Sequence, residues 1–252
     1  MSPAVAAHAI ATYSKPGDLV VDPMCGVGTT LVEAMHLDRM AIGVEKEQSC
    51  TALAMQNIEH AVDCGAPGFA TVVTGDPREA GALVGRDVCG RASLMLVALP
   101  QGLGDPGCDS GAPAYGPRWT IEAFAQVLSE CHALLKPGGF LVIAARGRRC
   151  LGEAGDGAIL AAKVAVDAGF ALHQRSAVLL AASPDIVPIA CVSDFPLADS
   201  DSALAVGDSR RFVAREAIVV ARVDRLGDHP IESTGCGCVP DQRYNTSSRR
   251  SA

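Results

Sequence analysis

Aromatic residues are scarce in this chain. They make up 4% of its 252 residues, with one Trp and three Tyr, whereas hydrophobic residues of all kinds reach 49%. The core must therefore rest on Ala, Val and Leu, and a chain of this length can bury a sizeable one. These figures predict one domain, with or without appendages.

An excess of positive charge and long apolar runs are both missing. The chain has 21 Lys and Arg against 28 Asp and Glu, a net charge of −7 and an isoelectric point near 5.3. This balance argues against a chain-wide basic surface for nucleic acid and leaves a local patch open. No apolar run is long enough to span a membrane, and the N-terminus lacks the pattern of a signal peptide. We therefore expect a soluble, cytoplasmic protein that does not enter a membrane.

Metal-binding cysteine patterns are missing despite ten cysteines. The chain has no CxxC pair, and Cys236 and Cys238 form a CxC without further partners. The six histidines are dispersed and form no ligand pattern. We expect reduced, mostly buried thiols and no metal site.

Short apolar runs alternate with helical patterns along the chain. The expected strands span residues 19–22, 40–45, 70–75, 92–99, 140–144, 171–182 and 216–223, and the expected helices span 1–13, 31–37, 49–64, 121–135 and 158–168. This alternation predicts an α/β fold with a doubly wound, mostly parallel, Rossmann-like sheet. The last two strands have no helix between them, which predicts an antiparallel edge hairpin. We assign residues 1–226 to one domain and expect the polar residues 227–252 to form a disordered tail.

The segment from Gly17 to Thr30 predicts a strand, a glycine turn and the start of a helix. An apolar run ends in Asp22, a turn follows up to Gly28, and Thr29 or Thr30 can cap the next helix. Ligands of open α/β sheets lie at the carboxyl ends of strands, so this turn is the first candidate binding site.

Three successive strands end in an acid: Asp22, Glu45 and Asp76. Carboxylates at one sheet edge suit a nucleoside-like ligand, and Glu45 follows Asp22 at about the 20-residue spacing typical of a ribose-binding acid. An acid beside the turn suits a cation better than a pyrophosphate, which favours S-adenosylmethionine over a dinucleotide. A dinucleotide oxidoreductase stays as a further alternative, as does the simpler interpretation that the acids only cap turns.

The segment Asp22-Pro-Met-Cys-Gly-Val-Gly-Thr-Thr30 resembles the DPxxGxGTT motif of S-adenosylmethionine-dependent amino methyltransferases. It is most similar to the DNA methylases that modify adenine N6 or cytosine N4, and the resemblance extends over roughly residues 1–145. It implies a Rossmann-like methyltransferase that transfers a methyl group to an exocyclic amine of a nucleobase. The implied cofactor is S-adenosylmethionine. The implied partner is nucleic acid, DNA before RNA, reached directly or through a partner protein.

The resemblance also implies which residues bind the cofactor. They are Asp22, Pro23, Met24, Cys25, Gly26, Gly28, Thr29, Thr30, Glu45, Asp76 and Pro77. The turn would surround the methionine part of the cofactor, with the two threonines near its carboxylate. Glu45 would hold the ribose, Asp76 would accept a hydrogen bond from the adenine amine, and Pro77 would lie against the ring. Cys25 is interpreted as a small residue beside the cofactor and not as a reactive thiol.

The substrate segment departs from the family. Where the family has [D/N/S]-P-P-[Y/F/W], this chain has Ala98, Leu99, Pro100 and Gln101, so the side-chain acceptor and the stacking ring are both missing. This predicts either an enzyme with an altered substrate site or a cofactor-binding homologue without catalysis. A methyltransferase for an RNA guanine or a small molecule is the third interpretation.

Three nearby features could contact a substrate. Tyr115 or Trp119 could supply a displaced ring, although packing at the helix start is the more ordinary role for Trp119. The run Arg146-Gly-Arg148-Arg149 either contacts phosphates or forms a solvated loop.

Overall fold

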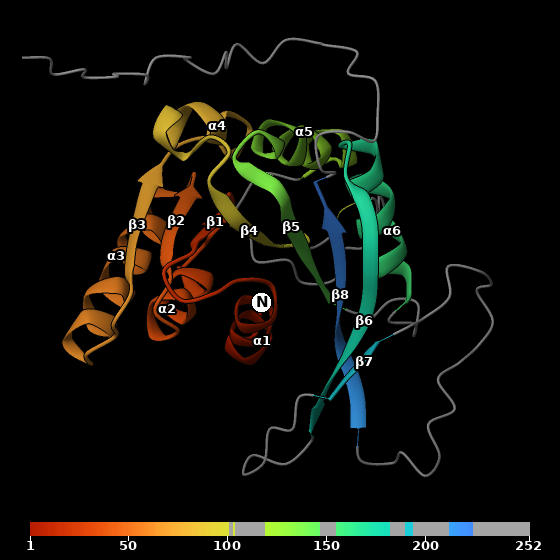
Figure 1. The fold of residues 1–252 in the computed structure, drawn as a ribbon, viewed down its shortest axis with the longest axis horizontal. Helices are drawn as coiled ribbons and strands as arrows, with labels where there is room; N and C mark the ends of the chain where they lie inside the picture. The colour runs from red at the N-terminus through yellow and green to blue at the C-terminus, as the bar shows by residue number, and fades with distance from the viewer. Residues whose placement is uncertain (101–102, 104–118, 147–154, 182–189, 194–211, 224–252) are drawn as a thin grey trace, which may run out of the picture.

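The computed structural model describes residues 1–100, 103, 119–146, 155–181, 190–193 and 212–223. Within these residues eight strands form one sheet in the order β3-β2-β1-β4-β5-β8-β6-β7 (Figure 1). The strands are β1 (Leu19–Asp22), β2 (Met40–Glu45), β3 (Phe69–Thr74), β4 (Ala92–Ala98), β5 (Leu135–Arg146), β6 (Ala171–Ala181), β7 (Ala190–Ser193) and β8 (Phe212–Arg222). Strands β1 to β5 run parallel, and β8, β6 and β7 add antiparallel pairs. The predicted α/β fold with an antiparallel edge is confirmed.

Helices cover both faces of this sheet. They are α1 (Pro3–Tyr13), α2 (Thr29–His36), α3 (Gln48–Asp63), α4 (Ala80–Leu83), α5 (Ile121–His132) and α6 (Gly155–Asp167), with 3₁₀ turns η1 (Pro77–Glu79) and η2 (Arg86–Val88). Helices α1 and α2 pack on one face, and α5 and α6 pack on the other. No described helix is long and apolar enough to cross a membrane.

Alternation along the buried strands creates the two halves of the core. Val20 belongs to the cluster beneath α1 and α2, whereas its neighbour Val21 belongs to the cluster beneath α5 and α6. Leu94 and Met95 in β4 divide in the same way. Because successive strand side chains point to opposite faces, a continuous apolar run supplies both layers at once. This explains how a chain poor in aromatics fills its core.

The strand order reverses between β1 and β4. Helix α2 follows β1 and leads to β2 on one side, while β4 lies on the other side of β1. In open α/β sheets a ligand binds in the crevice at the carboxyl ends of the strands beside such a reversal. The turn after Asp22 therefore lies where the topology predicts a binding site.

Several local expectations need correction. Neither threonine caps α2: the N-cap residue is Gly28, with φ of 84°, and no side chain caps the helix. Strand β5 begins at Leu135 and not at 140, because it continues through the glycine turn with a shift in its pairing to β4. Asp76 lies two residues beyond the end of β3 and caps η1.

Other expectations differ in extent or lie outside the described residues. Strand β8 begins at Phe212, four residues before the expected start, and β7 was not predicted. The polar tail, most of the loop after β4, Gln101 and Tyr115 lie outside the described residues.

Candidate functional site

The glycine turn after β1 presents an open backbone surface. Gly26 and Gly28 have φ of 56° and 84°, which side chains other than glycine rarely adopt. A Cβ placed on Gly26 would meet no atom within 4 Å, whereas one on Gly28 would lie 3.2 Å from the Cβ of Ala54 in α3. Gly26 therefore leaves room for a ligand, and Gly28 allows α3 to approach the turn.

Three hydrogen bonds hold this turn in place. The Cys25 amide donates to the carbonyl of Val44 over 3.0 Å, and the Gly28 amide donates to the Cys25 carbonyl over 2.9 Å. From α3, Asn57 Nδ2 donates to the Val27 carbonyl over 2.8 Å. The role of Asn57 was missed in the sequence, because a lone Asn on a helix gives no signal of a distant backbone partner.

Asp22 is the buried carboxylate of the site. It is 3% exposed, and its Oδ1 accepts a hydrogen bond from the Met24 amide over 3.0 Å. Burial raises the pKa of Asp22 to about 6, against the stabilising effects of Thr30 and the Met24 amide, and the charge of Glu45 adds to the increase. Thr30 Oγ1 lies near enough to favour the ionised form, but it has no hydrogen bond of standard geometry within the described part of the chain.

Glu45 connects the ends of β1 and β2. Its Oε2 accepts from the Gly26 amide over 2.9 Å, and its Oε1 accepts from the Glu47 amide over 2.8 Å. The Glu45 carbonyl accepts from the Gly75 amide over 2.9 Å, which brings the segment after β3 to the same edge. The three sequence-predicted acids thus lie along one edge of the sheet.

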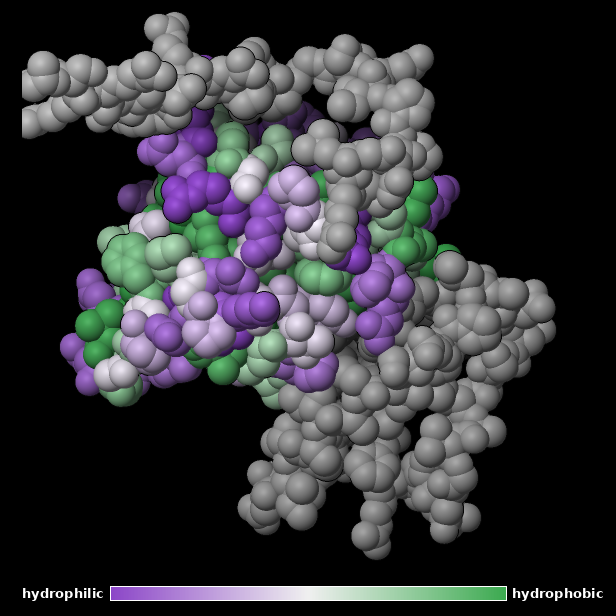
Figure 2. All heavy atoms as spheres, viewed as in Figure 1, coloured by the Kyte–Doolittle hydropathy of each residue, from purple (hydrophilic) through white to green (hydrophobic). Residues whose placement is uncertain are grey.

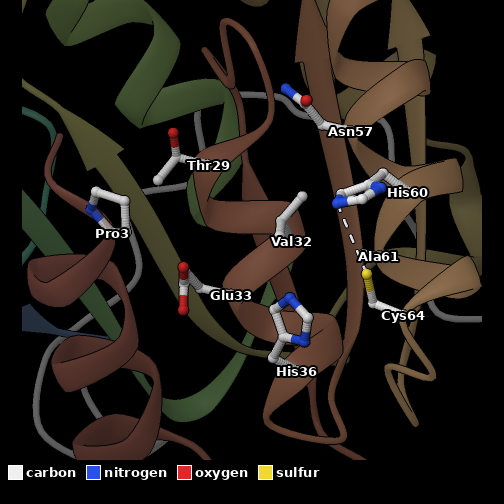
Figure 3. A pocket seen from close by; sticks show the side chains of 9 residues that line it. All are labelled: Pro3, Thr29, Val32, Glu33, His36, Asn57, His60, Ala61 and Cys64. Carbon is white, nitrogen blue, oxygen red and sulfur yellow. Dashed lines mark hydrogen bonds between the residues drawn. The ribbon is translucent and has the colours of Figure 1, made fainter.

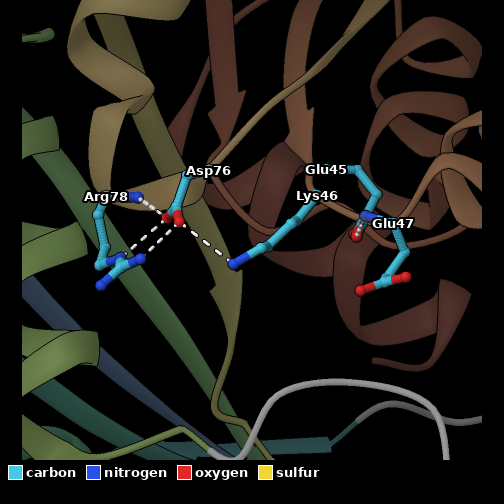
Figure 4. A network of polar contacts seen from close by, with 5 residues as sticks. All are labelled: Glu45, Lys46, Glu47, Asp76 and Arg78. Carbon is cyan, nitrogen blue, oxygen red and sulfur yellow. Dashed lines mark hydrogen bonds and ion pairs between the residues drawn. The ribbon is translucent and has the colours of Figure 1, made fainter.

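Asp76 is engaged by two cations, as Figure 4 shows. Arg78 Nη2 lies 2.6 Å and Lys46 Nζ lies 3.3 Å from Asp76 Oδ2. Hydrogen bonds from Arg78, ahead of the effect of Lys46, hold the pKa of the Asp76 carboxyl well below its usual range. Neither cation was predicted from the sequence to be part of the site.

The remaining turn residues differ in their exposure. Pro23 and Cys25 are buried, while Met24 is half-buried and packs against the core beneath α5. Burial raises the pKa of the Cys25 thiol far above its usual value, first through desolvation and then through Asp22. A buried thiol of this kind is a poor nucleophile, in agreement with the interpretation of Cys25 as a small packing residue. Pro77, the first residue of η1, is buried.

The altered substrate segment begins at the last residue of β4. Ala98 is half-buried, and the amide of Leu99 donates to the Ala144 carbonyl of β5 over 2.9 Å. The Leu99 side chain packs against the core, as does that of Trp119. Leu103 is buried beside them, with 3% exposure. The described part of this segment thus presents hydrophobic packing, and Pro100 is its one match to the family motif.

Thr29, the first residue of α2, is half-buried. It lines a groove of about 240 Å³ between α2 and α3, with Pro3 of α1 at its side (Figure 3). The other lining residues are Val32, Glu33, His36, Asn57, His60, Ala61 and Cys64.

Among the residues that the structure describes, no three His, Cys, Asp or Glu side chains are placed to hold a metal ion.

The surface seen in Figure 2 mixes hydrophilic and hydrophobic side chains, with hydrophobic ones over β3 and α3. Phe69 of β3 is 66% exposed, and Val62 of α3 is 58% exposed.

Arg146 ends β5 at the same edge as the site, while the two arginines that follow it lie outside the described residues.

The sheet order, the glycine turn at its reversal point and the acids along its edge together define a Rossmann-like methyltransferase fold. Residues 1–56 match the family model of the DNA methylases. This match runs from α1 into α3 and contains the whole glycine turn and Glu45.

Solved structures share the fold at low sequence identity. A candidate rRNA methylase from Clostridium thermocellum is 16% identical with a TM-score of 0.51, over 87% of this chain and 95% of that one. An S-adenosylmethionine-dependent O-methyltransferase from Thermotoga maritima is 13% identical with a TM-score of 0.54, and the match covers 91% of this chain and 68% of that one. TrmN from Thermus thermophilus is 16% identical with a TM-score of 0.51, over 88% of this chain and 49% of its own.

Proposed function

We propose that this protein is an S-adenosylmethionine-dependent methyltransferase of the amino type, which methylates an exocyclic amine of a nucleobase in DNA. The observation that carries the proposal is the pair of carboxylates, Asp22 and Glu45, beside the open backbone of Gly26. The match of residues 1–56 to the DNA methylase model supports the same conclusion. In this proposal residues 1–226 form the methyltransferase unit.

The donor groups present fit this cofactor. Asp22 is a buried acid near the turn, and a bound cation would favour its ionised form. Glu45 uses two hydrogen bonds of the roughly four that a carboxylate can accept, so it can still receive ribose hydroxyls. Gly26 leaves the space that a ligand needs beside the backbone.

Each group then has one task. Asp22 would face the methionine end, Glu45 would orient the ribose, and Asp76 with Pro77 would lie on the adenine side. When bound, the cofactor would supply an electrophilic methyl group on a sulfonium sulfur. A substrate amine would accept this group in exchange for an N–H proton, which would pass to solvent. The protein contributes mainly by positioning the two partners in line.

A specific observation favours a second candidate, a cofactor-binding homologue without methyl transfer. Ala98 offers no side-chain acceptor, and Leu99 packs into the core. Loss of a stacking ring alone costs about 1–3 kcal/mol of base binding. Solved structures with this fold include a candidate rRNA methylase and an O-methyltransferase, which keeps RNA and small molecules among the substrates to be tested.

Calorimetry with S-adenosylmethionine tests the shared first step. The wild-type protein is expected to bind, and Asp22→Ala and Glu45→Ala are expected to abolish detectable binding. Asp63→Ala removes an exposed acid at the end of α3 and serves as the matched control. Absence of binding by the folded wild-type protein would reject both candidates.

Methyl transfer from radiolabelled cofactor separates the candidates. DNA, RNA and small-molecule amines are offered in parallel to the wild-type protein and to the triple variant Ala98→Ser, Leu99→Pro, Gln101→Tyr. Labelling of DNA by the wild-type protein supports the enzyme, whereas labelling by the triple variant alone supports the impaired homologue. Labelling confined to RNA or a small molecule would contradict the DNA assignment.

A further inference from the structure

The Asp76 carboxylate has no free acceptor position. Its Oδ1 accepts from the Arg78 amide and from Arg78 Nε, each over 3.0 Å. Its Oδ2 accepts from Arg78 Nη2 over 2.6 Å and from Lys46 Nζ over 3.3 Å. These four hydrogen bonds fill the roughly four lone-pair positions of a carboxylate.

The carboxylate of Glu45, on the neighbouring strand, accepts fewer hydrogen bonds than that of Asp76. Among the residues that the structure describes, its carboxylate accepts hydrogen bonds from two backbone amides, those of Gly26 and Glu47, and from no cationic side chain. Figure 4 shows both carboxylates. The side chain of Lys46, the residue after Glu45, extends to Asp76. The ribose side of the proposed site is therefore ready to accept hydrogen bonds, and the adenine side is not.

We propose that Arg78 determines cofactor affinity by occupying Asp76, and that its guanidinium must leave this carboxylate before adenine can bind there. Lys46 has a smaller part in the same contact. This inference rests on the proposed function, since it concerns the adenine end of the same site. It makes Arg78 a competitor of the ligand and not a contact for it.

The geometry makes this displacement feasible. The Arg78 and Lys46 side chains are 46% and 44% exposed, so both can move into solvent. An exposed ion pair gains little net free energy, because water and salt compete for both charges. Asp76 Oδ1 still accepts a hydrogen bond from the Arg78 backbone amide after the side chain leaves, so the carboxylate keeps its place as the cap of η1.

Removal of the competing side chain should therefore strengthen binding. Arg78→Ala is expected to bind S-adenosylhomocysteine about threefold more tightly than the wild-type protein, within the limit of about fivefold that an exposed pair allows. S-adenosylhomocysteine is the better probe here, because it has no sulfonium charge that would respond to the loss of a nearby cation. Lys46→Ala should give a smaller gain, since it removes one longer hydrogen bond.

Arg86→Ala is the matched control, because it removes an exposed arginine of η2 that contacts no residue of the site. Its affinity should equal that of the wild-type protein. A direct readout comes from the Nε–H signal of Arg78 in NMR spectra, assigned by its loss in Arg78→Lys. Addition of the probe should shift this signal to the position of a solvated arginine.

The outcomes distinguish the inference from the function on which it rests. Weaker binding by Arg78→Ala, or an Arg78 signal that does not change with the probe, would overturn the inference while the proposed function stands. If neither the wild-type protein nor Arg78→Ala binds the probe, the proposed function fails, and this inference fails with it.

Discussion

The amide of Gly26 donates a hydrogen bond to Glu45 Oε2 over 2.9 Å, although the two residues lie 19 positions apart. The bond joins the turn after β1 to the end of β2, and the parallel register of the two strands aligns these ends. It fixes the orientation of the carboxylate before any ligand arrives. A preorganised acceptor of this kind reduces the ordering that binding would otherwise require.

Glu45→Gln should therefore weaken cofactor binding strongly. The amide keeps one acceptor oxygen, but its NH₂ group would face either the Gly26 or the Glu47 amide, a donor against a donor. We expect at least a tenfold rise in Kd by calorimetry, about 1.4 kcal/mol. The control Glu59→Gln, on the exposed face of α3, should leave Kd unchanged. A Glu45→Gln protein that binds normally would show that this carboxylate does not hold the ribose.

Cofactor affinity should also fall at acidic pH. Asp22 has a pKa of about 6 because it is buried, and only its ionised form attracts a cationic ligand. One pH unit below that value about a tenth of the carboxyl is ionised, so affinity at pH 5 should be about tenfold lower than at pH 8. Calorimetry across this range measures the effect. Asp22→Asn should bind weakly at every pH, and a wild-type affinity that is constant from pH 5 to pH 8 would contradict the prediction.

The same carboxyl should make Asp22→Asn more stable than the wild-type protein. In the unfolded chain the pKa is 3.8, so between that pH and about 6 the folded protein keeps a proton that the unfolded chain has lost. Stability therefore decreases as the pH rises through this window, and above about pH 6 the cost is complete. Asn can accept the Met24 hydrogen bond without a charge. We expect a gain on the order of 3 kcal/mol in urea denaturation at pH 8 and almost none at pH 4. A loss of stability at pH 8 would show that the charge is compensated in the fold.

The strands and the acids at their ends were predictable because each depends on a short local pattern. The run of β4 is apolar except for Ser93 and is buried along almost its whole length, which is typical of a strand covered on both faces. The acids Asp22 and Glu45 directly end such runs, so the parallel topology alone places them at one edge. This accounts for the agreement between the predicted and observed positions of the glycine turn.

The cations on Asp76 were not predictable by the same route. Lys46 and Asp76 are 30 residues apart, and their contact depends on how the segments beyond β2 and β3 continue. The sequence indicates that the Arg78 amide can donate to an Asp two residues earlier. It does not indicate in which direction the Arg78 side chain extends. The Gly28 cap of α2 was not predicted either. Gly28 takes the N-cap position with a left-handed backbone, so Thr29 and Thr30 lie one and two positions inside the helix and do not cap it.

Arg39 should be essential for stability, because it is a buried cation that holds two helix ends. It is 6% exposed, and its Nε and Nη2 donate to Ser14 Oγ and the Ser14 carbonyl over 3.1 and 2.8 Å, while Nη1 donates to the Leu37 carbonyl. Within the described residues it forms no ion pair, so the carbonyls that follow α1 and α2 supply its negative partners.

Arg39→Met should then lower the free energy of unfolding by about 2–4 kcal/mol, since it leaves these buried acceptors unpaired. Arg39→Lys should recover part of the loss, because an ammonium group reaches some of the carbonyls but lacks the planar fork. Urea denaturation measures both, with Arg86→Met as a control expected within about 0.5 kcal/mol of the wild-type protein. Equal stability of Arg39→Met and the wild-type protein would show that water replaces these contacts at no cost.

Gly43→Ala should destabilise the protein through Cys25. A Cβ on Gly43 would lie 2.6 Å from Cys25 Sγ and 2.9 Å from Leu31 Cδ1, so the turn or the helix behind it must move. Overpacking of this kind costs about 1–3 kcal/mol. Because the sulfur makes the shortest of these contacts, Cys25→Ala in the same chain should restore part of the loss, although Cys25→Ala alone destabilises slightly by leaving a small void. A double-mutant cycle in urea measures this coupling. Strictly additive effects would show that the strand moves away from the turn, and that Cys25 does not set the distance between β2 and the glycine turn.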